Sequence, residues 1–299
     1  MEMKSYIMRS ITTVVLFLVV LAVSGCEDEP PTDYVSEPFL EAYLIVDEPI
    51  QGIVVANSQP ITEAFDYAGM MERNAQVTIT TGSDVYSLEY AETDGIGSYR
   101  YPDTSVRIKP GTKYAIAVLM PDGKELSAET VTPERISWTI EPREFLQYPQ
   151  DTTVLFSPDS LRIAWTPGNS IEYIIRVKAL DTLGYGQYLE PATTEINERT
   201  NNIPFEEPDD PTFYTLTRWG FVQTNQAPTV WAAFRWYGRN EVAILAPDQA
   251  MLDWFKATQW GGRSVEYRPE FSNVNGGVGI LASASVIEQD VFVLKRKKQ

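Results

Sequence analysis

Residues 39–133 alternate apolar and polar side chains with a period of two, and this pattern limits the fold more than any other feature of the chain. The alternation is clearest in AQVTIT at residues 75–80 and in KYAIAVL at residues 113–119. It is typical of strands that bury one face. Turn residues separate these stretches, among them Gly82 and the PDG of residues 121–123. Seven or eight short strands with this spacing predict a β-sandwich.

A second β-sandwich is expected after a junction near residues 132–136. The stretches ISWTIEP, SLRIAWTP and IEYIIRVKAL look like the opening strands of a fibronectin-type-III-like domain, in which Trp165 is a core residue. We therefore predict a mainly β chain with two tandem β-sandwiches of the immunoglobulin or fibronectin-III kind. They occupy residues 39–133 and residues 134–299.

Two segments interrupt the second domain. Residues 181–211 show little periodicity over a length that is unusual for a loop, so they are either a functional excursion or a loosely ordered insertion. We predict one short helix over residues 247–259, with Pro247 in its first turn. Its apolar stripe, formed by Met251, Leu252, Trp254 and Phe255, favours a packing face over a partner-docking face.

The only cysteine of the chain, Cys26, follows an uncharged apolar run at residues 11–23, and Lys4 and Arg9 precede that run. The run is shorter than the roughly 20 residues of a membrane-spanning helix and is typical of a secretory signal. The sequence V-S-G-C resembles the bacterial lipoprotein signal, which predicts removal of residues 1–25 and acylation of Cys26. An ordinary signal peptide with a chance cysteine is the alternative. With its thiol acylated, the chain has no disulfide and must fold by its core alone.

Residues 26–38 are acidic and contain prolines, so we expect an extended tether. Glu27, Asp28 and Glu29 directly follow the cysteine and resemble the surface-export signal of Bacteroidota lipoproteins. A solvated linker on the periplasmic side is the alternative. We expect a lipid-anchored protein of the outer membrane that faces the cell exterior.

Charge and histidine content restrict the function. The net charge of −17 disfavours binding to nucleic acid and to anionic lipid surfaces, because both require a positive field. The absence of histidine excludes Ser-His-Asp catalysis and histidine zinc sites. We therefore expect no enzyme, no cofactor and no metal, and a carboxylate-only hydrolase is the less favoured alternative. The EEPDD of residues 206–210 could hold calcium, but a solvated acidic turn is the commoner explanation.

Four aromatic residues near one another in sequence are candidates for stacking on the apolar faces of sugars. They are Trp219, Trp231, Trp236 and Tyr237. Packing in the core or at a sheet edge is the competing explanation, and we favour it because 12% of all residues are aromatic.

The order of these features resembles an uncharacterised family of Bacteroidota outer-membrane lipoproteins, domain of unknown function 4249. The most specific stretches are NAQVTI at residues 74–79, PGTKYAIAV at residues 110–118 and FSNVNGGVGI at residues 271–280. The resemblance implies no known activity and no catalytic residues. It does imply a partner, since such proteins often accompany SusC-like TonB-dependent receptors. The expected function is a non-catalytic accessory subunit of such a transporter, for ligand capture or assembly, and a surface adhesin without a transporter is the alternative.

Overall fold

A computed structural model describes most of the chain after the predicted tether. The described residues are 34–60, 63–93, 96–150, 155, 161–200, 217–257 and 271–296. Cys26, Glu27, Asp28, Glu29 and residues 201–211 therefore lie outside the described residues. Residues 37–58 and 66–299 belong to one compact unit, and residues 1–36 and 59–65 belong to another. The architecture below is that of the first unit.

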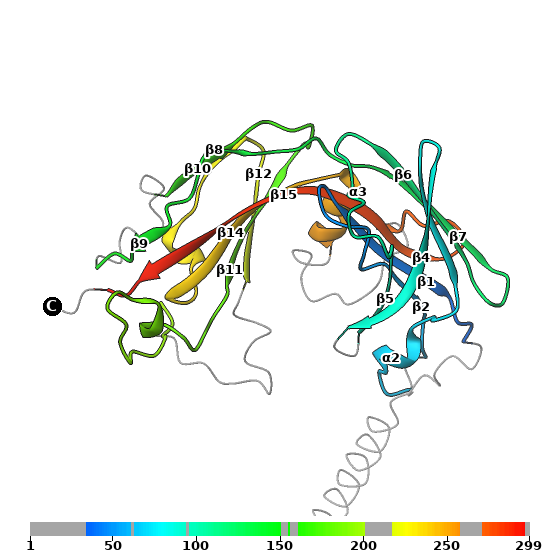
Figure 1. Cartoon of the computed structure of the whole chain (residues 1–299), viewed down its shortest axis with the longest axis horizontal. Coiled ribbons are helices and arrows are strands. Elements are labelled where there is room, and N and C mark those ends of the chain that lie inside the picture. Colours follow the sequence, from blue (N-terminus) through cyan, green and yellow to red (C-terminus); the bar gives the residue numbers. More distant parts are fainter. Residues whose placement is uncertain are drawn as a thin grey trace, which may run out of the picture. The chain divides into compact units, whose positions relative to one another are not determined.

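An antiparallel five-stranded sheet forms where the sequence alternates most regularly, in the order β5–β4–β3–β6–β7 (Figure 1). Its strands are β3 Gln76–Thr81, β4 Asp84–Thr93, β5 Ile96–Arg100, β6 Lys113–Leu119 and β7 Glu125–Val131. In β6 and β7 alternate residues are buried, as the period of two predicts. The tight turn between β3 and β4 places Gly82 at φ +57°, a conformation that glycine adopts without strain.

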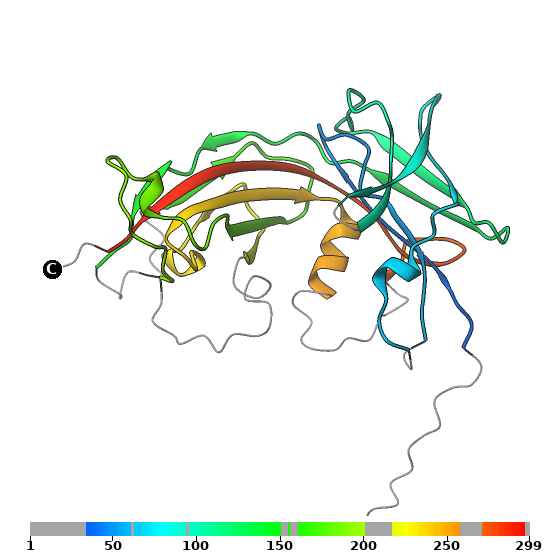
Figure 2. The ribbon, with the colours of Figure 1, turned by 60° about the horizontal axis from the view of Figure 1, so that its bottom comes forward.

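A seven-stranded sheet combines strands from both ends of the chain, in the order β12–β11–β14–β15–β1–β2, with β9 paired to β15. Its strands are β1 Pro38–Ile45, β2 Val54–Asn57, β9 Phe145–Gln147, β11 Tyr173–Ala179, β12 Thr217–Val222, β14 Gly238–Pro247 and β15 Val278–Leu294. The 17-residue β15 pairs in parallel with β1 at its start and antiparallel with β14 farther along (Figures 1 and 2). The mainly β prediction is confirmed. Strands from both predicted domains nevertheless pair in this sheet. The domain boundary at residue 133 stays a prediction.

A three-stranded sheet of order β13–β10–β8 belongs to the C-terminal half. Its strands are β8 Trp138–Ile140, β10 Arg162–Trp165 and β13 Gln226–Pro228. Trp165 is fully buried and meets the Tyr173 ring edge-on at 5.3 Å between centroids. The prediction that Trp165 is a core residue is therefore confirmed.

Three apolar clusters fill the spaces between these layers. The first joins β1 and β2 to the five-stranded sheet, for example Leu40 with Ile79 and Ile116. The second lies in the C-terminal half and includes Trp165 and Val293. The third covers the other face of the seven-stranded sheet. Because β15 contributes residues to all three clusters, it connects the cores of the two halves.

The predicted C-terminal helix is present as α3, Gln249–Phe255. Pro247 was expected in its first turn, and this expectation is wrong: Pro247 is the last residue of β14, where it still pairs with Ala284. Asp248 caps the helix by accepting a hydrogen bond from the Met251 N–H at 2.7 Å. Met251 is buried in the third cluster, and the Phe255 ring lies 4.6 Å from that of Trp219, so the stripe is a packing face, as predicted.

Two further stretches between the named strands take other forms. Residues 229–238 contain a 3₁₀ turn, Trp231–Ala233, in which the Ala233 N–H donates to the Val230 carbonyl at 2.9 Å and the Ala232 N–H donates to the Leu155 carbonyl at 3.1 Å. In the VRIKPG stretch, residues 106–111, Arg107 forms an isolated bridge with Pro49. The sequence also gave no indication of the four-residue helix α2, Tyr67–Met70, or of the 3₁₀ turn Gly186–Tyr188.

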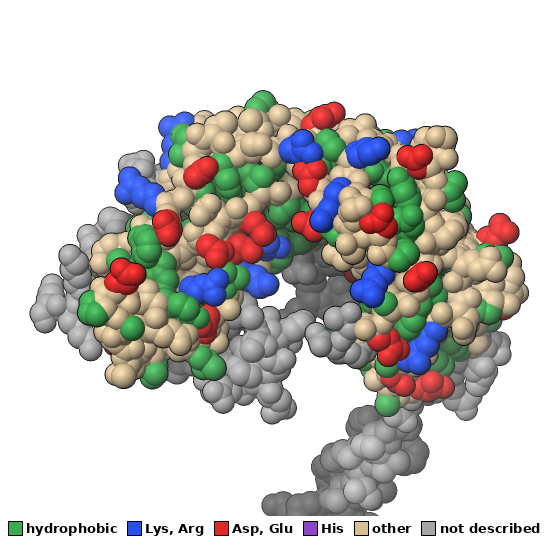
Figure 3. Space-filling model, viewed as in Figure 1, with side chains coloured by type: hydrophobic (Ala, Val, Ile, Leu, Met, Phe, Trp, Pro, Cys, Tyr) green, Lys and Arg blue, Asp and Glu red, His purple; other side chains and the backbone are tan. Residues whose placement is uncertain are grey.

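Acidic and basic side chains are interspersed on the face shown in Figure 3, with apolar side chains between them. Among the described residues, no helix has the length and apolarity to cross a bilayer.

Candidate docking site

The described part of the predicted excursion, residues 181–200, is fixed to the core by hydrogen bonds. The Asp181 carboxylate accepts from the N–H groups of Leu183 and Gly184, both at 2.8 Å, and from the Tyr188 hydroxyl at 2.8 Å. The Gly184 N–H, helped by Tyr188 and Leu183, holds the pKa of the Asp181 carboxyl below its ordinary value. The start of the excursion is therefore a defined turn.

Two buried polar residues hold the end of the excursion. Asn197 donates from its amide to the carbonyls of Asp181 and Tyr237, at 2.8 and 2.9 Å. Thr200 donates from its hydroxyl to the Phe234 carbonyl at 2.7 Å. Buried polar groups with their partners in place specify one conformation, because each lost partner leaves a desolvated group unpaired.

Lys295, just beyond β15, also binds the excursion through its side chain and its backbone. Its ammonium donates to the Ile196 carbonyl at 2.6 Å and pairs with the Glu198 carboxylate at 2.7 Å. Its backbone N–H donates to the Tyr185 hydroxyl at 2.9 Å. Tyr185 is buried in the second cluster, and burial raises the pKa of its hydroxyl. The alternative of a loosely ordered insertion therefore does not hold for residues 181–200.

This anchored excursion leaves large apolar side chains in solvent. The side chains of Leu183 and Ile196 are 83% and 74% exposed. The backbone at Ile196 is nevertheless held in place, because it forms a bridge with Gly184. Phe145, on the neighbouring β9, is 57% exposed. A rigid loop that displays apolar side chains is typical of a recognition surface.

A shallow groove of about 210 Å³ lies beside the excursion, and we call it the excursion groove. Among the described residues it is lined by Glu144, Phe145, Tyr188, Arg239, Asp290, Val291 and Phe292. The Phe292 ring lies 6.1 Å from that of Phe145 and 6.3 Å from that of Tyr188. The Arg239 guanidinium stands 5.6 Å from the centre of the Tyr188 ring and pairs with Asp290 at 3.2 Å. Aromatic and arginine side chains of this kind are enriched in protein interfaces.

The four aromatic candidates from the sequence do not share one surface. Trp231 and Tyr237 are buried in the second cluster, where both rings pack against Tyr148 at 5.5 and 5.3 Å. Burial raises the pKa of the Tyr237 hydroxyl. These two rings have no open face for a sugar.

Trp219 and Trp236 are partly buried, and each lies beside an arginine. Trp219 packs on α3 and lies 5.8 Å from the Arg176 guanidinium, and Trp236 lies 5.4 Å from that of Arg199. Core packing therefore accounts for Trp231 and Tyr237, and stacking on a sugar stays a prediction for Trp219 and Trp236. The residues of the excursion groove were missed, because Phe145, Tyr188 and Arg239 come from three segments that are distant in sequence.

No cluster of three or more metal-binding side chains occurs in the part of the chain that the structure describes. The acidic residues 206–210 lie outside it. The excursion groove contains carboxylates, an arginine and aromatic rings, a set that suits recognition of a protein surface.

Comparison with known families covers most of the chain. The family described as a domain of unknown function, DUF4249, matches residues 39–290. The chain belongs to this family. The match begins in β1 and ends in β15, so it includes both halves and the shared sheet. A search of curated proteins finds no match.

Proposed function

We propose that this DUF4249 protein is a non-catalytic lipoprotein of the outer membrane that docks onto a β-barrel receptor of the TonB-dependent kind through the excursion groove. The observation that carries the proposal is the exposure of Phe145 in the groove and of Leu183 and Ile196 on the anchored excursion. The predicted anchor at Cys26 and the tether after it keep the folded unit within reach of a membrane partner. At about 3.3 Å per residue, the twelve residues after Cys26 span at most about 40 Å.

The anchor is tested with Cys26→Ser in cells fed a labelled fatty acid. We expect the variant to lose the label and to leave the membrane fraction, because the lipid is attached through that sulfur. A Ser24→Ala variant, which keeps the cysteine and a small residue before it, serves as the control and should retain the label. Label and membrane retention in both variants would contradict the anchor.

Docking is tested by co-purification of the tagged protein from native outer membranes in mild detergent. We expect the double variant Leu183→Asp, Ile196→Asp to recover at least about tenfold less receptor, because charges at an apolar contact cost about 2 kcal/mol or more. Both side chains are exposed in the unbound protein, so its unfolding midpoint should not change. Deletion of residues 185–209 is a poor test, since it removes the buried Tyr185, Asn197 and Thr200.

The matched control is Val85→Asp, since Val85 is 63% exposed on β4, far from the excursion in sequence. This variant should recover as much receptor as the wild type. If the wild type elutes alone at its monomer mass in several mild detergents, the adhesin function replaces the transporter-accessory function. If receptor co-purifies equally with all variants, the docking surface lies elsewhere.

A further inference from the structure

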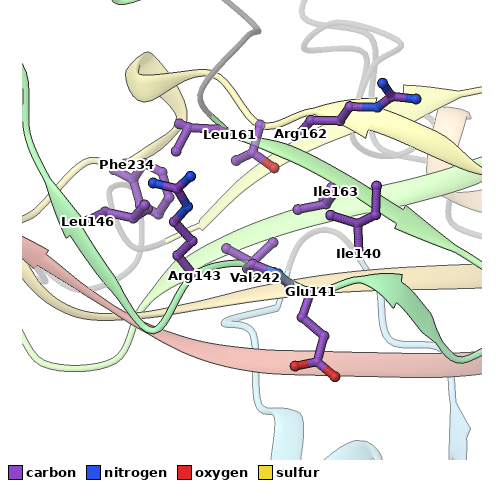
Figure 4. A pocket seen from close by; sticks show the side chains of 11 residues that line it. Ile140, Glu141, Arg143, Leu146, Leu161, Arg162, Ile163, Phe234 and Val242 are labelled. Carbon is purple, nitrogen blue, oxygen red and sulfur yellow. The ribbon is translucent and has the colours of Figure 1, made fainter.

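A cavity of about 250 Å³ lies between the three-stranded sheet and the seven-stranded sheet, at the edge where β8 connects to β9 (Figure 4). Its described apolar lining comes from both sheets and from the segment after β13: Ile140, Leu146, Leu161, Ile163, Phe234 and Val242. An apolar cavity of about 150 Å³ is large enough for a benzene ring. This cavity therefore has room for a ring and a short chain.

Arg143 lies on the connection between β8 and β9, at the mouth of the cavity. Its guanidinium points into the space between Leu146, Leu161 and Phe234 (Figure 4). No ion pair joins Arg143 to any carboxylate in the described part of the chain. A guanidinium has five donors in a planar fork that fits a carboxylate.

The two other charged residues of the lining are placed differently. The Arg162 guanidinium donates to the side-chain carbonyl of Gln226 and points away from Arg143. Glu141 also turns its carboxylate away from Arg143. Arg143 is thus the cation of the lining whose donors are uncommitted among the described residues.

Thr229 supplies a second uncommitted donor. Its side chain lines the cavity, the residue is only 5% exposed, and its hydroxyl oxygen is buried with no hydrogen-bond partner among the described residues. Its backbone N–H donates to the Leu161 carbonyl at 3.0 Å, which fixes the residue beside β10. A buried hydroxyl without a partner is unfavourable, and a ligand oxygen would relieve this cost.

We propose that this cavity binds a small organic anion, a monocarboxylate whose apolar body is about the size of a phenyl ring with a short chain. The apolar body lies between the two sheets, and the carboxylate accepts hydrogen bonds from Arg143 and from the Thr229 hydroxyl. Ligand pockets commonly combine an apolar lining with a few such polar groups. The inference does not rest on the proposed docking function, and no residue of the excursion groove takes part in it.

Calorimetric titration of the full chain in lipid nanodiscs, with empty nanodiscs as the blank, tests the proposal. The probes are 4-phenylbutyrate and its neutral analogue 4-phenylbutanol. We expect the carboxylate to bind and the alcohol to bind at least about tenfold more weakly, because a hydrogen bond between two charged groups is stronger than one to a neutral group. Arg143→Met should weaken carboxylate binding by a similar factor and leave binding of the alcohol unchanged.

Two further variants separate ligand binding from folding. Arg100→Met removes an exposed arginine of β5, outside the lining, and should change the affinity by less than about twofold. Thr229→Val keeps the side-chain volume and removes the unpaired hydroxyl, so the unliganded protein should unfold at a higher temperature while its affinity for the carboxylate falls.

Three results overturn the proposal: no binding of 4-phenylbutyrate at about 10 mM, a concentration that reveals even millimolar affinity; equal affinities for acid and alcohol; or carboxylate binding unchanged by Arg143→Met. Receptor docking is tested with variants of Leu183 and Ile196, and carboxylate binding with variants of Arg143 and Thr229. The failure of one proposal can therefore be distinguished from the failure of the other.

Discussion

Replacing Gly279 with alanine should lower the free energy of unfolding of the protein by more than about 4 kcal/mol, because β1 and β15 could no longer pair in their present register. Gly279 lies opposite Leu40 and has φ +128°, a region that residues with a side chain rarely adopt. A Cβ atom there would stand 1.9 Å from the Leu40 carbonyl oxygen, so the backbone of β1 or β15 would have to shift. The strain and the lost pairing together exceed about 4 kcal/mol, a large share of the roughly 5–15 kcal/mol of a typical domain.

Urea unfolding followed by tryptophan fluorescence measures this effect, and Gly220→Ala is the matched control. Gly220 also lies in a strand, β12, but a Cβ atom there meets no atom within 4 Å. We expect this control to unfold at the wild-type urea concentration or slightly above it, since alanine reduces the entropy of the unfolded chain. A loss of less than about 1 kcal/mol in Gly279→Ala would contradict the parallel β1–β15 register.

The local part of this arrangement is readable from the sequence. The NGGVG stretch predicts turn glycines before a small-residue strand, and Gly276 does take a left-handed turn conformation, at φ +82°. The role of Gly279 is not readable, because its neighbour Leu40 lies 239 positions earlier and no local pattern encodes that pairing. The same reason explains why the sequence does not predict the sheet to which both halves contribute: the periodicity identifies strands, and only their pairing reveals the shared sheet.

The candidate site shows a similar limit. The lack of periodicity in residues 181–211 indicates an excursion, and its first part does display Leu183 and Ile196 in solvent. The lack of periodicity does not indicate that Asn197 and Tyr185 are buried. Their hydrogen-bond partners, the carbonyl of residue 237 and the backbone N–H of residue 295, are distant in sequence. Aromatic content was equally ambiguous, since the same side chains suit a stacking platform and a core.

Asp248 connects three elements through one carboxylate. One of its oxygens accepts from the Met251 N–H of α3, and the other accepts from the Ser283 N–H and hydroxyl of β15, both at 2.9 Å, and from the Thr130 hydroxyl of β7. Thr130 and Ser283 are buried. The carboxylate therefore holds the start of α3 against the two strands.

Asp248→Ala should lower the free energy of unfolding by about 3–5 kcal/mol, because it removes the acceptor that the buried donors of Thr130 and Ser283 share, as well as the helix cap. Asp66→Ala is the matched control. Asp66 caps α2 by accepting from the Gly69 N–H at 3.0 Å, but it is exposed, so its loss should cost about 1 kcal/mol. Urea denaturation of both variants gives the comparison, and equal losses would show that Asp248 is only a helix cap.

The pH dependence of stability distinguishes the charge of Asp248 from its hydrogen bonds. Burial raises the pKa of this carboxyl above its ordinary value of 3.8, although the donors from Thr130, Met251 and Ser283 act in the opposite direction. The folded state then binds the proton more tightly than the unfolded state does. The resulting stabilisation is complete below the ordinary pKa and is lost as the pH rises through the raised one.

Asp248→Asn has no such proton, so the stability of the wild type relative to this variant should fall as the pH rises from about 3.5 to 7. Carboxyls with lowered pKa values, such as those of Asp47 and Asp181, are present in both proteins and cancel in this difference. A relative stability that rises with pH would mean that the hydrogen-bond donors outweigh burial, and that the ionised carboxylate is the form that the fold stabilises.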